Sequence, residues 1–240
     1  MKALWAQMKF QKDLFLTGVL VMLGMFVFGT ILHDVILVSG DEVDSVFCMG
    51  SFMALIVLCM MMFFFAGIHM VQIFNYAVAM GQTRKRTFPL YTIATFFTFI
   101  VLQVLLMLMN VLERWRLGLM FPGLQIEDFI TEVLDIRFMP GFALVGTAFC
   151  VLLGASISRF GKTAFWVWWV LLMTTCIVGP RIGTYLGCEN PDSPLMVWVN
   201  GVMEFVVAHA AAVGVASVIA ATVIFTGIAY LLVRRQQVNV

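Results

Sequence analysis

Long apolar runs alternate with short polar segments along the whole chain. A helix rises about 1.5 Å per residue, so about 20 apolar residues cross the hydrocarbon core of a bilayer. Six runs approach or exceed this length, and they predict an all-α membrane protein with six transmembrane helices in one domain over residues 1–240. The runs are Leu14–Leu32, Val46–Tyr76, Leu90–Leu112, Phe138–Ile157, Thr163–Val178 and Val197–Val233.

Composition supports a membrane location. Of the 240 residues, 62% are hydrophobic and 11% are charged, which is more apolar surface than a soluble domain can bury. The formal net charge of +1 leaves no broad basic face for nucleic acid. The five cysteines lack the spacing of a metal site. Cys48 and Cys188 both fall on the predicted outer side, where they are either disulfide-bonded or small hydrophobic residues.

The cations predict the orientation. If the N-terminus is cytoplasmic, the inner segments hold ten of the fourteen Lys and Arg residues and the outer segments hold four. Short cytoplasmic loops are enriched in Lys and Arg, so we expect both termini inside and a multi-pass protein of the cell membrane. The inner cations are Lys2, Lys9, Lys12, Arg84, Lys85, Arg86, Arg159, Lys162, Arg234 and Arg235; the outer ones are Arg114, Arg116, Arg137 and Arg181.

Two segments outside the spans have helical patterns. Residues 1–13 place Met1, Trp5 and Met8 on one face, which predicts a helix in the inner headgroup layer; the alternative is a frayed basic tail. On the outer side, Gln125–Arg137 has one apolar and one acidic side and predicts a short amphipathic helix over the mouth of the bundle.

The region before the last span holds the candidates for a transport pathway or gate. Small residues recur every fourth position after the fifth span, and a proline there breaks the regular helix. We expect the fifth span to end at this point and residues 183–204 to form an outer re-entrant hairpin or loop, with the last full span beginning nearer Phe205. The candidate residues are Gly179, Pro180, Gly183, Glu204 and His209.

Other polar residues at membrane depth are functional candidates by default, because a polar group there is costly. They are His69, Gln72, Asn75, Gln103 and Asn110. For His69, Gln72 and Asn75 we expect an interhelical hydrogen bond near the cytoplasmic end rather than a substrate contact. The last span is rich in alanine and glycine, which predicts a closely packed helix inside the bundle or at a dimer seam.

Two residue patterns resemble catalytic sites but do not meet the requirements of those sites. Gly161-Lys162-Thr163 ends like a phosphate-binding loop, but Ser156 stands where that loop needs glycine and the segment follows a transmembrane helix. A pair formed by Ser156 and His209 would suggest an intramembrane protease. However, His209 lies about 24 residues from the inner end of its helix, over 30 Å above the inner surface. We therefore predict no catalytic residue and no nucleotide or metal site in this chain.

The tightest basic cluster lies between the second and third apolar runs. Gly81 is suited to end a long helix, and Thr83 is suited to cap a short one that carries Arg84, Lys85 and Arg86 into the cytoplasm. Such a cluster is most often a topology signal in contact with headgroups. It is also suited to dock a soluble partner.

The order of residues in this segment resembles a known family. Residues 80–88, Met-Gly-Gln-Thr-Arg-Lys-Arg-Thr-Phe, are similar to the G-x-[ST]-R-[KR]-x-x-[FY] loop of permease subunits in type-2 ABC exporters of Gram-positive bacteria. That family also has an interfacial N-terminal helix, six spans, a cytoplasmic coupling helix after the second span and an outer re-entrant region before the sixth. The similarity covers the whole chain in architecture and about nine residues in motif.

The resemblance implies a passive subunit that pairs with a second permease subunit, identical or similar, in the lipid bilayer. Separate cytosolic ATPases, which carry ATP and Mg²⁺, would dock on the coupling segment of residues 80–89. Its residues here are Gly81, Gln82, Thr83, Arg84, Lys85, Arg86, Thr87 and Phe88. Relatives in the family export peptides, lipids or drugs or confer resistance to antimicrobial peptides. The alternative is a stand-alone membrane immunity or sensor protein without an ATPase partner.

Overall fold

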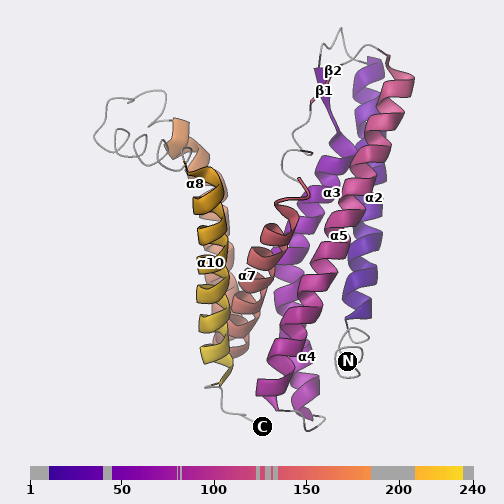
Figure 1. The fold of residues 1–240 in the computed structure, drawn as a ribbon. Coiled ribbons are helices and arrows are strands. Elements are labelled where there is room, and N and C mark those ends of the chain that lie inside the picture. Colours follow the sequence, from indigo (N-terminus) through magenta and orange to yellow (C-terminus); the bar gives the residue numbers. More distant parts are fainter. Residues whose placement is uncertain are drawn as a thin grey trace.

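The computed structural model describes residues 11–39, 45–79, 81, 83–122, 125–127, 131, 135–184 and 209–234. In these parts the chain is almost entirely helical (Figure 1). The helices are α2 (Lys12–Ser39), α3 (Met49–Met60), α4 (Ala66–Ala79), α5 (Arg84–Met120), α7 (Met139–Phe160), α8 (Lys162–Thr184) and α10 (Ala210–Arg234). A π-helical segment, η1 (Met61–Phe65), joins α3 to α4. Two strands, β1 (Ser45–Phe47) and β2 (Gln125–Glu127), complete the fold.

Four of the described helices are long and apolar enough to cross a membrane. These spans are Phe15–Ser39, Lys85–Met120, Met139–Phe160 and Ala212–Arg234. The prediction of an all-α protein of the membrane type is therefore confirmed at this level. The 37 residues of α5 correspond to about 55 Å of helix, against a hydrocarbon core of about 30 Å. Both ends of α5 therefore extend beyond the lipid chains.

Helix α7 lies in the middle of the bundle and contacts α4, α5, α8 and α10. On the other side, α2 packs against α3 and α5 (Figure 1). The backbones of α2 and α3 meet closely at two glycines. A Cβ atom on Gly29 would lie 2.9 Å from the Cα atom of Gly50, so a side chain there would separate the two helices.

The structure corrects three predicted boundaries. Val46 lies in strand β1, so the second run becomes helical only at Met49. Gln125–Glu127, expected to start an amphipathic helix, pairs in parallel with Ser45–Phe47 instead. Helix α8 continues through Gly179 and Pro180 to Thr184 rather than ending at them. The strands form because each segment's backbone finds a partner far away in sequence, which helical periodicity does not reveal.

Other predictions fall partly on residues that the structure does not describe. Residues 1–10 of the predicted interfacial helix lie outside the described parts, and α2 already begins at Lys12, inside the expected range of 1–13. Most of the predicted outer region 183–204 also lies outside them; its first two residues, Gly183 and Thr184, belong to α8. Cys188 is not described, so neither alternative, a disulfide with Cys48 or two small hydrophobic residues, is tested.

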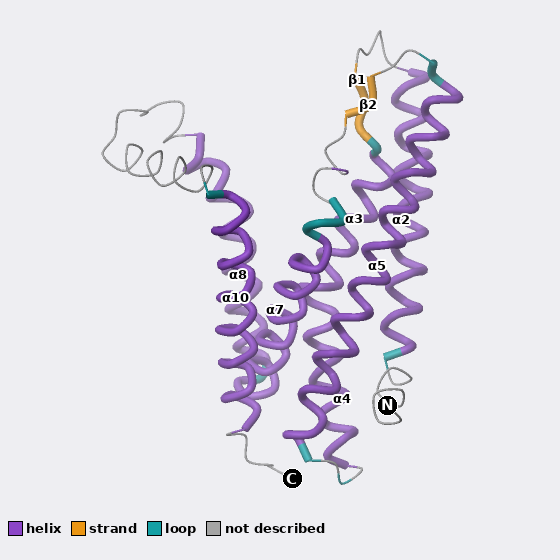
Figure 2. Tube along the Cα trace, viewed as in Figure 1, coloured by secondary structure: helices purple, strands orange, loops and turns teal. Residues whose placement is uncertain are grey.

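One end of the bundle gathers the segments that the sequence assigns to the cytoplasm. The start of α2, the turn between α4 and α5, the turn between α7 and α8 and the end of α10 lie at this end (Figure 2). We call it the basic end, because Lys12, Lys85, Arg86, Lys162 and Arg234 are there and exposed. Strands β1 and β2 lie at the opposite end, which we call the acidic end after Asp34 and Glu113 in the helices beside the strands.

Candidate functional site

The turn between α4 and α5 contains the predicted coupling segment. Gly81 adopts a φ of +74°, a left-handed conformation that glycine adopts without steric cost. No atom lies within 4 Å of the position that a Cβ atom would occupy, so the backbone alone accounts for the glycine. The prediction that Gly81 ends a long helix agrees with this geometry, because α4 ends at Ala79. Gln82 is outside the described residues.

The basic residues after this turn belong to α5 itself. Arg84 is the first residue of α5, and the backbone N–H groups of Arg86 and Thr87 donate to the carbonyl oxygen of Thr83 at 2.9 and 3.1 Å. The prediction of a separate short helix is therefore wrong, because the chain continues helically through Pro89. Thr83 occupies the capping position, but its hydroxyl makes no capping hydrogen bond.

The segment has an exposed half and a buried half. Lys85 and Arg86 are exposed, whereas Thr87 and Phe88 are buried, with 1% and 5% of their surface accessible. The Phe88 ring packs edge-on against Phe74 of α4, with centroids 6.5 Å apart, and against Tyr230 of α10, at 5.7 Å. A force applied to the exposed cations would therefore reach α4 and α10 directly through this aromatic contact.

The charge of this helix start is unfavourable by itself. The first turn of α5 contains Arg84, Lys85 and Arg86 and no acidic residue. The N-terminus of a helix carries a partial positive charge, so each cation there costs about 0.3–1 kcal/mol at low ionic strength. An acidic partner surface or lipid phosphates would remove this cost.

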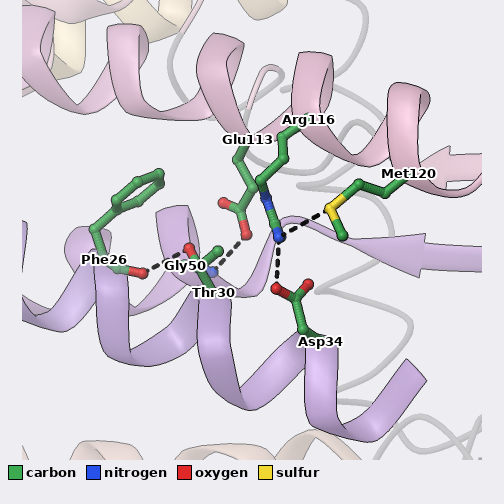
Figure 3. A network of polar contacts seen from close by, with 7 residues as sticks. All are labelled: Phe26, Thr30, Asp34, Gly50, Glu113, Arg116 and Met120. Atoms are coloured by element: carbon green, nitrogen blue, oxygen red, sulfur yellow. Dashed lines mark hydrogen bonds and ion pairs between the residues drawn. The ribbon is translucent and has the colours of Figure 1, made fainter. Parts of the chain in front are cut away.

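The acidic end contains a buried carboxylate that the sequence analysis missed. Glu113, in α5, is 1% exposed and accepts hydrogen bonds from the first turn of α3 (Figure 3). The Gly50 N–H donates to Oε1 at 2.8 Å, and the Ser51 N–H and hydroxyl donate to Oε2 at 2.7 and 2.6 Å. The carboxylate thus satisfies N–H groups that a helix start leaves without partners.

An ion pair lies next to this carboxylate. Arg116 Nη1 lies 2.6 Å from Oδ2 of Asp34, joining α5 to α2 (Figure 3). In α2, the His33 ring stacks on Phe47 of β1 with centroids 6.5 Å apart. Together with the β1–β2 pair, these contacts fasten the acidic ends of α2, α3 and α5 to one another. The only sequence signal was Glu113 itself, one residue beyond the predicted third span.

The polar residues at membrane depth divide into exposed and buried groups. Gln72 and Asn75 are exposed on α4, so an interhelical hydrogen bond within the described part of the chain is not their role. Asn110 donates to the Thr131 hydroxyl at 3.2 Å. Gln103 is fully buried, and neither atom of its amide has a hydrogen-bond partner among the described residues. His69 is partly buried, and its Nδ1 atom likewise has no such partner.

The predicted gate residues do not form a described cluster. Gly179, Pro180 and Gly183 lie in the last turns of α8, and His209 is exposed immediately before α10. Glu204 is outside the described residues. These helix ends share the acidic end of the bundle (Figure 1).

The rejected protease pair is also far apart in the structure. Ser156 lies near the basic end of α7, whereas His209 precedes α10 at the acidic end (Figure 1). The Ser156 hydroxyl donates to the Leu153 carbonyl at 2.8 Å and accepts from the Trp168 indole at 3.0 Å. The Ser156 hydroxyl therefore links α7 to α8 through the hydrogen bond from Trp168.

Comparison of the chain with family models, curated proteins and solved structures finds no match in any of the three. The functional evidence therefore lies in the geometry of the basic end and in the order of its residues.

Proposed function

We propose that this chain is the permease subunit of a type-2 ABC exporter in the cell membrane. In this proposal residues 1–240 form one domain with six spans, and both termini are cytoplasmic. α3, η1 and α4 together supply the second span and α8 the fifth. Separate cytosolic ATPases bind ATP and Mg²⁺ and dock at residues 81–88. The substrate is a peptide, lipid or drug-like molecule.

The observation that carries the proposal is that the coupling segment has an exposed basic half and a buried half that contains Phe88. Lys85 and Arg86 are exposed at the basic end, and Phe88 is buried between α4 and α10. A soluble ATPase with acidic groups would relieve the repulsion at the start of α5. Its movement would also be transmitted to three helices through one ring. A loop that only fixes topology needs the cations but not this aromatic contact.

The exposure of α10 supports a second permease subunit. Only 6% of the most apolar stretch of α10 is buried against the rest of the described chain, although the helix is rich in alanine. The sequence offered burial inside the bundle or a dimer seam for this helix. Its exposed face favours the seam, because small residues give close helix contact in lipid.

Crosslinking tests the docking site directly. A photo-reactive amino acid at Lys85 should capture a nucleotide-binding subunit in native membranes, identified by mass spectrometry. The matched control is the same probe at Arg234, an exposed cation in α10 that also lies at the basic end of the bundle. Capture at neither position, together with no ATPase in mild-detergent purifications, would leave the stand-alone immunity or sensor protein as the better interpretation.

A pair of variants then separates docking from transmission. Lys85→Ala with Arg86→Ala should insert normally but abolish stimulation of the partner's ATP hydrolysis. Phe88→Ala should keep the ATPase bound while lowering transport per ATP hydrolysed. Unchanged stimulation in the double variant would show that this segment is not the docking site.

A further inference from the structure

A cavity of about 190 Å³ lies between η1, α7 and α8. Its walls are Phe64 of η1, Phe149 and Leu153 of α7, and Trp168 and Leu172 of α8. Sites for drug-sized ligands begin at about 300 Å³, so this cavity takes only part of a chain-like molecule. Its lining is nearly all apolar, so the part that enters it is apolar too.

The walls of the cavity are held in place by specific contacts. The rings of Phe149 and Trp168 pack edge to face with centroids 5.1 Å apart. The Trp168 indole N–H is fixed on the Ser156 hydroxyl at 3.0 Å. The cavity is therefore a formed feature of the α7–α8 contact rather than a gap between mobile side chains.

The cavity adjoins a groove on the exposed apolar surface of α8. A groove of about 580 Å³ follows the exposed face of α8 and shares Leu171 and Thr175 with the cavity. Its other lining residues include Trp166, Val167 and Val170, each more than half exposed. A chain from the bilayer can therefore enter sideways, along α8.

Two cations flank the turn that leads into α8, next to Thr163 at the start of the groove. Arg159 is in the last turn of α7 and Lys162 starts α8, and both are exposed at the basic end. The Arg159 guanidinium lies over the Phe160 ring, 5.4 Å from its centroid. Trp168 follows Lys162 by six residues and Thr175 by thirteen, or about 9 and 20 Å along the helix. Acyl chains occupy these depths when their phosphate lies level with the cations, because one leaflet including its headgroups is about 20 Å deep.

We propose that this is a binding site for one anionic phospholipid. An acyl chain of the lipid enters the cavity between Phe64, Phe149 and Trp168, and its phosphate contacts Arg159 and Lys162. The apolar cavity selects a chain and the cation pair selects a negative headgroup, so the two features together fit a lipid of this class. The site does not depend on an ATPase partner and stands or falls separately from the proposed transport function.

Native mass spectrometry of the detergent-purified chain tests the site. Phosphatidylglycerol and phosphatidylcholine with the same acyl chains are the probes. We expect one tightly bound phosphatidylglycerol and much weaker binding of phosphatidylcholine. Arg159→Gln with Lys162→Gln should weaken phosphatidylglycerol binding by roughly 25-fold, about fivefold for each cation near the surface. Arg234→Gln, at another exposed cation of the same end, should change it little.

A cavity-filling variant tests the acyl site separately. Leu172→Trp should weaken phosphatidylglycerol binding by about tenfold or more, the effect of excluding two methylene groups. Ile177→Trp is the matched control, since Ile177 is exposed on α8 and lines neither cavity nor groove. Equal binding by these two variants would overturn the proposal. So would equal binding of the two lipids by the unaltered chain. If Leu172→Trp prevents folding, the surface variant of Arg159 and Lys162 still decides the question.

Discussion

The contact between Glu113 and the start of α3 should be one of the strongest single stabilising features of the acidic end. In Glu113→Gln the side chain keeps its length, and one oxygen can still accept from the Gly50 N–H. The amide nitrogen then faces the Ser51 N–H, which loses its acceptor and stays buried. A hydrogen bond to a charged group contributes about 1.5–3 kcal/mol, and an unsatisfied buried N–H costs about 1–3 kcal/mol. We expect a loss of about 2–4 kcal/mol.

Thermal unfolding in detergent, followed by circular dichroism, measures this loss. For a chain of this size 1 kcal/mol corresponds to about 2–4 °C, so Tm should fall by roughly 5–15 °C. Asp13→Asn is the matched control, because Asp13 is an exposed carboxylate in the first turn of α2. Its interaction with the helix dipole is about 0.3–1 kcal/mol, so its effect should be several times smaller.

A double-mutant cycle checks that the loss arises at this contact. Ser51→Ala removes only the hydroxyl donor, 2.6 Å from Oε2, and should cost about 1–2 kcal/mol. Combined with Glu113→Gln, the two losses should not be additive, because both variants change the same contact between the Ser51 hydroxyl and Oε2. A Tm for Glu113→Gln equal to that of the Asp13→Asn control, or strictly additive losses, would refute the reasoning.

Three further predictions use the same unfolding assay. Gly154→Ala should destabilise the protein by about 1–3 kcal/mol, because the new Cβ would lie 2.8 Å from a backbone oxygen of α4. Gly118→Ala, in open space on α5, should instead stabilise it by about 0.5–1 kcal/mol. Equal effects of the two variants would contradict the packing argument. Tyr91→Phe should cost about 1–2 kcal/mol, because its buried hydroxyl donates to the Ala66 carbonyl at 2.6 Å where η1 passes into α4; a neutral result would mean that this carbonyl is satisfied otherwise. Gly81→Ala should lose about 1–2 kcal/mol and Gly81→Asn less, because asparagine tolerates a positive φ better; the reverse order would argue against the left-handed turn.

The candidate site at the basic end was largely readable from residue order. Gly81 marks a turn that needs a positive φ, and the cations after it are too polar for the hydrocarbon. The burial of Phe88 was not readable. It depends on Phe74 and on Tyr230, which is 142 positions further along the chain and approaches only because α10 packs on α7.

The acidic end shows why helix ends were misplaced. The first run was expected to end at Leu32, yet α2 continues to Ser39, past His33 and Asp34. These polar residues remain helical because Phe47 and Arg116 provide partners for them. A count of apolar residues shows whether a segment can cross the hydrocarbon core. It does not show how far tertiary contacts extend the helix beyond that core.

The sequence by itself determined that this is a helical protein of the membrane type and that its chain turns at Gly81. These properties follow from the length of apolar runs and from the local conformational limits of single residues, and both are written in consecutive positions. The tertiary structure alone decided which polar groups meet. Glu113 and Ser51 are 62 residues apart, and the strands that pair at Val46 and Ile126 are 80 apart. Such contacts depend on how whole helices pack, and no local pattern in the chain encodes that.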